Sequence, residues 1–162
     1  MNFLGVLEHL SQEGVEFVIV GGVAARLHGS HRLTHDLDLV PRLDESSWAR
    51  LIDAIWELDV RPRIPESRER IADLTNIKTW ITEKNMIALS FRSDAGETEI
   101  DLLVAESVSF EKLKRNAVSI SLERSTFYVA SIDDLIEMKS KAGRPQDLLD
   151  IETLNRLKAS TS

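Results

Sequence analysis

The chain has 162 residues, which fits one domain, since single domains usually run from ~100 to ~200 residues. With 43% hydrophobic and 29% charged residues, the composition is that of a globular protein with a core of its own. Asp and Glu number 27 against 20 Lys and Arg, and the net charge of −7 disfavours binding of duplex nucleic acid through the overall field. Cysteine is absent, which excludes disulfides, thiolate zinc sites and a cysteine nucleophile.

The hydropathy pattern predicts a soluble, cytoplasmic protein that makes no contact with a membrane. The longest apolar run, Phe17 to Ala25, is far shorter than the ~20 residues of a membrane-spanning helix. The opening stretch MNFLGVLEHL lacks a basic n-region and contains Glu8, so it does not resemble a signal peptide.

The N-terminal part predicts the order helix, strand, helix, strand. Phe3 to Gln12 places apolar residues at helical spacing, and Gly14 follows as a stop. Val15 to Val20 is a short β-branched run, typical of a strand buried on both faces. A glycine pair then leads into a short helix that ends at Gly29, and His35 to Val40 predicts the second strand.

Capping residues, turn residues and periodicity predict the remaining elements in the same way. In chain order we first expect a helix that is capped by Asp44 to Ser47 and runs to about Leu58, and then a loop over Arg61 to Arg70 that leads into a helix near Glu69 to Leu74. A β-hairpin made of Met86 to Phe91 and Thr98 to Val104 and further strand structure over Val118 to Val129 follow. Two helices, Ser131 to Lys141 and Gln146 to Lys158, complete the list.

These elements predict an α/β (α+β) fold with a small mixed β-sheet flanked by helices. No internal repeat, low-complexity segment or long linker divides the sequence. We therefore expect a single domain over residues 1–162, with a core at about 15–130 and C-terminal helices at about 131–158.

Two aspartates separated by one residue lie in the strand expected at 35–40. Asp36 and Asp38 project from one face of such a strand, and the leucines that alternate with them point into the core. Two carboxylates this close repel each other unless a cation lies between them, and Mg²⁺ prefers oxygen ligands. By itself the pair also fits the polar face of an edge strand or a helix cap.

Gly21 and Gly22 lie where the first strand ends and a helix begins. Free backbone N–H groups and the helix dipole at such a point can receive a phosphate. An isolated glycine pair would instead indicate a turn that needs a positive φ. The succession of strand, glycine pair, short helix and a second strand with Asp36 and Asp38 favours the phosphate site.

The pattern apolar-Gly-Gly, thirteen residues, Asp-apolar-Asp-apolar resembles the signature of the nucleotidyltransferase fold of the DNA polymerase beta superfamily. The string GGVAARLHGSHRLTHDLDLV is also similar to small prokaryotic nucleotidyltransferases of the abortive-infection toxin type. The resemblance implies that Asp36 and Asp38 hold two Mg²⁺ ions and that Gly21 and Gly22 receive the β and γ phosphates of an NTP.

The resemblance also implies a third carboxylate on a later strand, and the segment Glu99-Ile100-Asp101-Leu102-Leu103 offers one. Asp101 is assigned to this place, as a metal ligand that helps to deprotonate the attacking hydroxyl. Glu99 shares its face of the strand and is the fallback. A simple charge at a strand end is the alternative interpretation of Asp101.

The C-terminal string SIDDLIEMKSKAGRPQDLLDIETL is similar to a further segment of the same family. This similarity implies that Lys139, or its neighbour Lys141, neutralises charge on the triphosphate. Arg144 would add a forked donor pair. Arg32, just before the aspartate strand, is another candidate for contact with phosphate, and its alternative is a solvated loop charge.

Two aspartates of this string, Asp147 and Asp150, lie one turn apart near the start of the last helix. They fit stabilisation of the helix dipole as well as a direct catalytic part. The spacing of His28, His31 and His35 does not fit a zinc site.

The resemblance implies a Mg²⁺-dependent nucleotidyltransferase that moves a nucleoside monophosphate from an NTP to an acceptor and releases pyrophosphate. Three acceptors fit the family: tRNA, a partner protein within a toxin–antitoxin pair, and a small molecule. The net charge argues against an extended RNA contact but leaves room for a short one at Arg61 to Arg70 or Lys112 to Arg115.

Two other interpretations remain open. One is a non-catalytic antitoxin or scaffold module with the same fold, which the presence of all three acids disfavours. The other is a generic α/β domain in which the aspartate pair is a coincidence.

Overall fold

The structure of the chain is a computed structural model that describes residues 2–161. Its helices are α1 (Phe3–Gln12), α2 (Gly21–Leu27), α3 (Glu45–Trp56), α4 (Arg68–Ala72), α5 (Leu74–Lys84), α6 (Phe110–Asn116), α7 (Ile132–Ala142) and α8 (Pro145–Thr161). Its strands are β1 (Phe17–Val20), β2 (Leu37–Pro41), β3 (Arg61–Pro62), β4 (Ala88–Arg92), β5 (Glu99–Leu103), β6 (Val118–Leu122) and β7 (Ser125–Val129).

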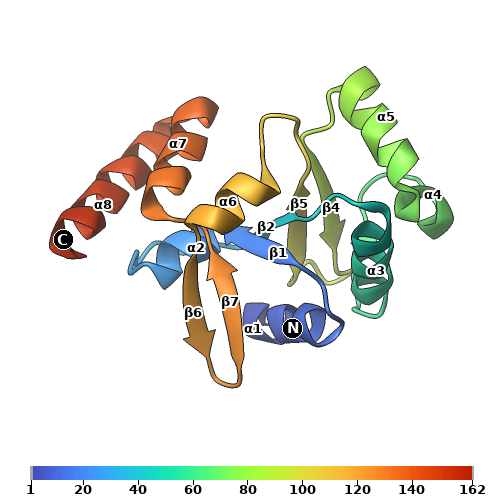
Figure 1. Ribbon diagram of the computed structural model, residues 1–162, viewed down its shortest axis with the longest axis horizontal. Coiled ribbons are helices and arrows are strands. Elements are labelled where there is room, and N and C mark those ends of the chain that lie inside the picture. Colours follow the sequence, from blue (N-terminus) through green and yellow to red (C-terminus); the bar gives the residue numbers. More distant parts are fainter. Residues whose placement is uncertain (1, 162) are drawn as a thin grey trace.

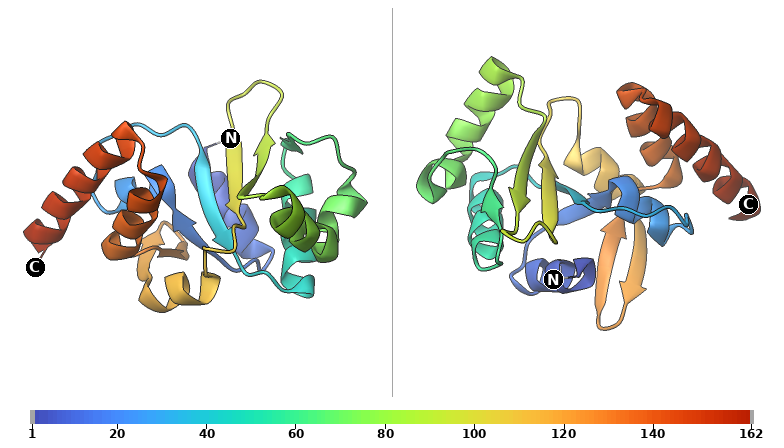
Figure 2. Two further views of the ribbon diagram at one scale, coloured as in Figure 1. Left: turned by 90° about the horizontal axis from the view of Figure 1, so that it is seen from above. Right: turned by 180° about the vertical axis from the view of Figure 1, so that it is seen from behind.

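A mixed sheet runs through the middle of the molecule, and helices flank it (Figure 1). Figure 2 shows α3, α4 and α5 gathered beyond one end of the sheet and α7 and α8 beyond the other. The described strands follow the order β3-β4-β5-β2-β1-β7-β6. The expected α/β architecture with a mixed sheet is therefore confirmed. None of the helices in residues 2–161 combines the length and apolar content that crossing a membrane requires.

The pairing in the centre of the sheet brings together strands that lie far apart in sequence. β2 pairs with β1 in antiparallel and with β5 in parallel orientation, and β1 is parallel to β7. The hairpins β4–β5 and β6–β7 and the short pair β3–β4 are antiparallel. Beside each other, β2 and β5 place Leu37 opposite Ile100 and Leu39 opposite Leu102, and all four side chains are fully buried.

Most predicted elements lie within a few residues of the observed ones. The helix predicted over Phe3 to Gln12 has those bounds, and the region 118–129 forms the β6–β7 hairpin. The loop prediction over Arg61 to Arg70 is wrong at its start, where β3 occupies Arg61–Pro62, whereas the helix expected near Glu69 to Leu74 is observed as α4. A two-residue edge strand that contains a proline has too little pattern to detect in a sequence.

Two helices, α5 and α6, were not predicted. Helix α5 carries three threonines, two isoleucines and a tryptophan, which favour helix weakly, and it buries Leu74, Ile77 and Trp80 in the core. Helix α6 is only two turns long and buries Phe110 and Leu113. In both cases burial of side chains in the core stabilises a helix that intrinsic propensity does not predict.

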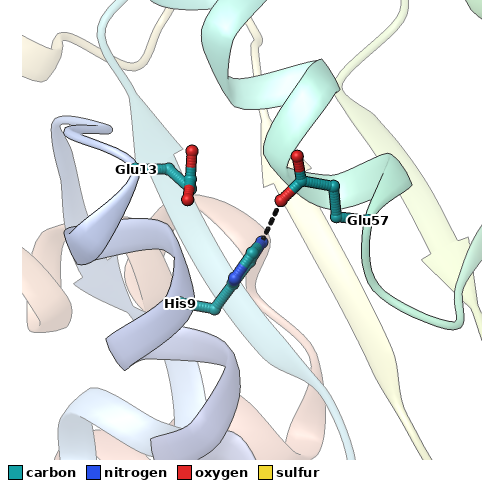
Figure 3. A group of neighbouring side chains, drawn as sticks. All are labelled: His9, Glu13 and Glu57. Atoms are coloured by element: carbon teal, nitrogen blue, oxygen red, sulfur yellow. Dashed lines mark ion pairs between the residues drawn. The ribbon is translucent and has the colours of Figure 1, made fainter.

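Helix α1 is joined to α3 through His9 (Figure 3). The Nε2 of His9 donates to the carbonyl oxygen of Ala54 at 2.9 Å and lies 3.3 Å from the Glu57 carboxylate. Donor atoms of His9, Glu13 and Glu57 approach within 4.8 Å. Because Nε2 is already bonded to a carbonyl and both glutamates are exposed, this group acts as a helix–helix contact.

Trp48 of α3 provides a test of the core. Its side chain is fully buried, and its Nε1 donates to the carbonyl oxygen of Ile71 at 2.8 Å. Trp48→Phe removes the donor and leaves a void, so we expect the free energy of unfolding to fall by about 2–4 kcal/mol in urea denaturation. Trp56→Phe, at a half-buried position of the same helix, is the control, and an equal loss there would contradict this account.

Candidate active site

Three aspartates, Asp36, Asp38 and Asp101, form a carboxylate cluster at the centre of the sheet. Asp38 of β2 lies directly opposite Asp101 of β5, and Asp36 immediately precedes β2. The side chains that alternate with them along the two strands are fully buried, so the aspartates all face the other side of the sheet. One ligand atom of each aspartate lies within 4.8 Å of the others.

The electrostatics of the cluster favour a bound cation. Burial, with repulsion from Asp36 and Asp101, raises the pKa of Asp38 to about 7. Burial also raises the pKa of Asp101, opposed by a hydrogen bond from Ser90. Within residues 2–161, Asp101 Oδ1 is buried and has no hydrogen-bond partner. The donor set therefore fits a divalent ion that prefers oxygen ligands.

The two glycines bring the start of α2 against these acids. Gly21 has a φ of +66°, and a Cβ on it would lie 2.0 Å from Asp38 Oδ2. A Cβ on Gly22 would lie 2.6 Å from Thr34 Oγ1. Any larger residue at either position would displace a neighbour of the cluster, so the glycines permit a close approach as well as a turn.

Thr34 belongs to the same arrangement, although the sequence analysis did not single it out. Its Oγ1 donates to the backbone carbonyl of Asp36 at 3.2 Å and to Asp36 Oδ1 at 3.3 Å. The hydroxyl thus orients the first carboxylate of the cluster. The signal that could have identified it is its place two residues before Asp36.

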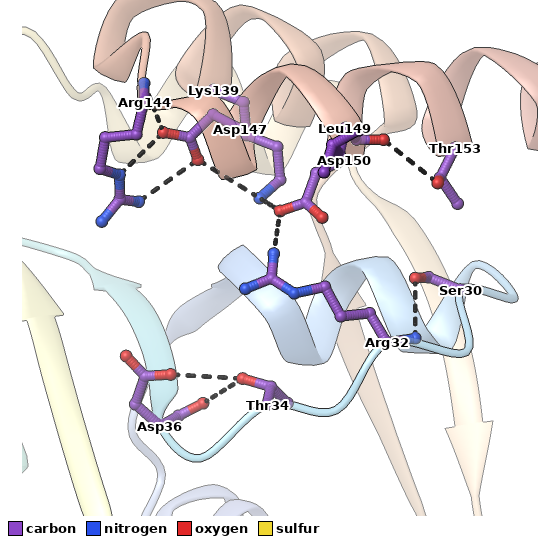
Figure 4. Close-up of polar contacts among 10 residues, drawn as sticks. All are labelled: Ser30, Arg32, Thr34, Asp36, Lys139, Arg144, Asp147, Leu149, Asp150 and Thr153. Carbon is purple, nitrogen blue, oxygen red and sulfur yellow. Dashed lines mark hydrogen bonds and ion pairs between the residues drawn. The ribbon is translucent and has the colours of Figure 1, made fainter.

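Three basic residues, Arg32, Lys139 and Arg144, form a cation cluster beside α7 and α8 (Figure 4). Each is paired with an aspartate of α8. Arg144 Nε lies 2.8 Å from Asp147 Oδ2, and Lys139 Nζ lies 2.9 Å from Asp150 Oδ2. Arg32 donates to the same Asp150 oxygen. The aspartates that were predicted to serve the helix dipole or catalysis therefore hold the cations.

A cavity of about 420 Å³ lies between the two clusters. Its lining includes Gly21, Gly22, Arg32, Asp36, Asp38, Lys139 and Arg144. Lys139 and Arg144 partly offset the raised pKa of Asp38, so their field reaches the carboxylates. The cavity thus has acids on one wall and cations on another.

The two candidates for the third carboxylate, Asp101 and Glu99, lie differently with respect to the cavity. Asp101 does not line the cavity and joins the site through its place beside Asp36 and Asp38. Glu99 does line the cavity, where it accepts a hydrogen bond from Arg63 at 3.3 Å. Of the two, Asp101 belongs to the carboxylate cluster.

The histidines near the site do not converge. His28 ends α2, and its Nε2 donates to the carbonyl oxygen of Ala130 at 2.8 Å. This bond joins α2 to the segment that follows β7. His35 lines the cavity, whereas His31 is exposed.

Gly21→Ala tests the close approach. Gly143 has nearly the same φ, +65°, but a Cβ there would meet only Ser140 O at 3.8 Å, so Gly143→Ala is a matched control for strain alone. We expect Gly143→Ala to lower the free energy of unfolding by about 1 kcal/mol and Gly21→Ala by at least about 2 kcal/mol, measured by urea denaturation. Equal losses would contradict a steric role of Asp38.

Asp38→Asn tests the stored repulsion through its pH dependence. The folded-state pKa of about 7 exceeds the ordinary value of 3.8, so the unfolded chain releases this proton first, and the penalty on folding grows as pH rises between the two values. Without divalent ions we expect the variant to be more stable than the wild type by on the order of 2 kcal/mol at pH 8 and equal to it near pH 3.5. Thermal unfolding across this range measures the difference, and a pH-independent difference would refute the assignment.

Comparisons with known proteins agree with the fold. A solved structure of similar fold is the crystal structure of an antigenic nucleotidyltransferase-like protein from Paracoccidioides brasiliensis, with a TM-score of 0.53, 18% sequence identity, and coverage of 95% of this chain and 73% of that chain. No curated protein matches this chain. A family model described as a nucleotidyltransferase of unknown function (DUF6036) matches residues 3–159. Since this match spans nearly the whole sequence, the chain belongs to that nucleotidyltransferase family.

Proposed function

We propose that the protein is a Mg²⁺-dependent nucleotidyltransferase that transfers a nucleoside monophosphate from an NTP to an acceptor. The observation that carries the proposal is the pairing of the carboxylate cluster with the cation cluster across one cavity. Its volume of about 420 Å³ falls in the range of small-molecule sites. A metal-bound triphosphate complements both walls, since it presents cations to the acids and anionic oxygens to Arg32, Lys139 and Arg144.

Asp36, Asp38 and Asp101 are the residues that would hold Mg²⁺. A divalent ion there supplies charge neutralisation for the phosphates and a lower pKa for the attacking hydroxyl. Two observations support this assignment: burial and the neighbouring acids raise the pKa of Asp38, and Asp101 Oδ1 is a buried acceptor without a hydrogen-bond partner, so a cation could satisfy both.

The chain's own groups account for the rest of the transfer. Gly21 and Gly22 bring the start of α2 to the β and γ phosphates, and Lys139, Arg144 and Arg32 offset the triphosphate charge. Asp101 takes the proton of the acceptor hydroxyl. The acceptor oxygen bonds to the α-phosphorus, the bond from that phosphorus to the β-phosphate oxygen breaks, and pyrophosphate leaves.

Three acceptors are consistent with this chemistry: tRNA, a side chain of a partner protein, and a small molecule. The net charge of −7 favours a short contact with any nucleic acid over an extended one. A tRNA or partner-protein acceptor would be consistent with a role in a toxin–antitoxin system.

Transfer of label tests the proposal. The protein is incubated with each α-³²P-labelled NTP and Mg²⁺, together with total tRNA, total cell protein or a small-molecule extract. We expect labelled product in one pool, loss of it with EDTA, and a fall on the order of 10³-fold for Asp38→Asn, because that residue would hold the metal ion that neutralises the phosphates. Gel electrophoresis and thin-layer chromatography identify the product.

Asp133→Asn is the control for the loss of one acidic charge, since Asp133 is an exposed residue paired with Lys158 outside the cavity. It should keep the wild-type rate. Binding of Mg²⁺·NTP without transfer to any pool would instead support a non-catalytic antitoxin or scaffold role. Absence of both binding and transfer would refute the proposal.

A further inference from the structure

One carboxylate oxygen joins three parts of the chain beside the cavity. Asp150 Oδ2 on α8 accepts from Lys139 Nζ on α7 at 2.9 Å and from Arg32 NH1 on the segment between α2 and β2 (Figure 4). Arg32 and Asp150 are 118 residues apart in the sequence. Asp150 is therefore the point at which the segment before the carboxylate cluster meets the C-terminal helices.

The burial of these groups makes the contact more than a surface ion pair. The side chains of Asp150 and Lys139 are only 12% and 13% exposed, and that of Arg32 is 44% exposed. Burial raises the pKa of the Asp150 carboxyl, but the hydrogen bonds from Lys139 and Arg32 outweigh it and hold the pKa below its ordinary value. Asp150 thus stays ionised between two cations.

Without Asp150, the two cations would lose the charge that holds them together. Arg32 and Lys139 share one oxygen atom, so the two like charges lie close enough to repel each other. Residues 30–35 have no regular secondary structure, and Leu33 beside Arg32 is 74% exposed. The segment has little apolar burial of its own at this point, so the bond to Asp150 has a large share in placing it.

The same segment leads directly into the carboxylate cluster. Two residues after Arg32, Thr34 donates to Asp36, the first acid of the cluster. Asp147 has a different part, since it is buried, accepts from the Arg144 backbone N–H at 3.1 Å and thereby caps the start of α8. Asp147 also pairs with the Arg144 side chain and lies 3.9 Å from Lys139 Nζ, so it serves the helix and its neighbouring cations. Asp150 differs from it in reaching across to Arg32 on the segment.

We propose that Asp150 is a positioning residue, which holds Arg32 and Lys139 together on the cavity wall and orders residues 30–36 for the nucleotide. This inference rests on the proposed function, because it takes the phosphates of the nucleotide as the groups that Arg32 and Lys139 bind. Asp150 acts through these two cations and does not contact the reacting atoms. The carboxylate acts before the nucleotide arrives, by placing the donors that the phosphates then contact.

Two measurements on Asp150→Asn test the proposal. The first is the dissociation constant of an α,β-methylene NTP with Mg²⁺, by calorimetry, which we expect to rise about tenfold for the loss of one charge-assisted contact. The second is amide hydrogen exchange of residues 30–36 in the free protein, which we expect to accelerate about tenfold. Asp150→Glu keeps the charge and should recover part of both effects.

Asp133→Asn is the matched control. Asp133 also joins α7 to α8, through Lys158 Nζ at 2.6 Å, but at an exposed position outside the cavity. It should change neither readout by more than about twofold. If Asp150→Asn folds poorly, Arg32→Gln removes the same contact from the segment, and the exchange of residues 30–36 should accelerate as much.

The outcomes separate the alternatives. Tighter nucleotide binding by Asp150→Asn would mean that Asp150 competes with phosphate for the cations, and it would overturn the proposal. Unchanged exchange of residues 30–36 would overturn it as well. A wild-type protein that binds no nucleotide would contradict the proposed function, whereas the exchange measurement would still decide whether Asp150 orders the segment.

Discussion

The parallel pairing of β2 with β5 is the constraint on which the candidate site depends. It places Asp38 opposite Asp101 and, on the other face, Leu37 opposite Ile100. A shift of one residue along either strand would turn that strand's aspartate toward the core and a leucine or isoleucine toward the cavity. The apolar pairs therefore hold the register, and the register holds the acids together. Burial of Leu37, Leu39, Ile100 and Leu102 offsets the repulsion that the carboxylates store.

The site combines regular secondary structure with an irregular segment. The sheet positions Asp38 and Asp101 through backbone pairing, and the glycine pair lets α2 approach them without a side chain between. The cations come from elsewhere: Lys139 from α7, Arg144 from the short connection between α7 and α8, and Arg32 from an irregular segment. Asp147 and Asp150 of α8 are what join these cations to the framework. A molecule with a net charge of −7 thus keeps three basic groups beside its most acidic cluster.

Much of the fold could be predicted because its patterns are local. The helix over Phe3 to Gln12, the alternation around Asp36 and Asp38, and the hairpin of β4 and β5 follow from spacing within ten or twenty residues. Helices α5 and α6 and the edge strand β3 could not, since their propensity is weak or their length short and burial decides them. Thr34 could not be predicted, because a threonine two residues before an aspartate is a weak signal until the folded segment turns its hydroxyl toward Asp36.

The candidate site residues are recognisable from the amino-acid sequence alone: two aspartates on one strand face, a third on a later strand, a glycine pair at a strand end, and basic residues near the last helices. Alternation and turn chemistry act over a few residues, so they can be read without the fold. The pairing of β2 with β5 and the contact of Arg32 with Asp150 across 118 residues of chain are visible only in the folded molecule. Such neighbours depend on how every strand and helix packs, because contacts between distant residues form only when the whole core does.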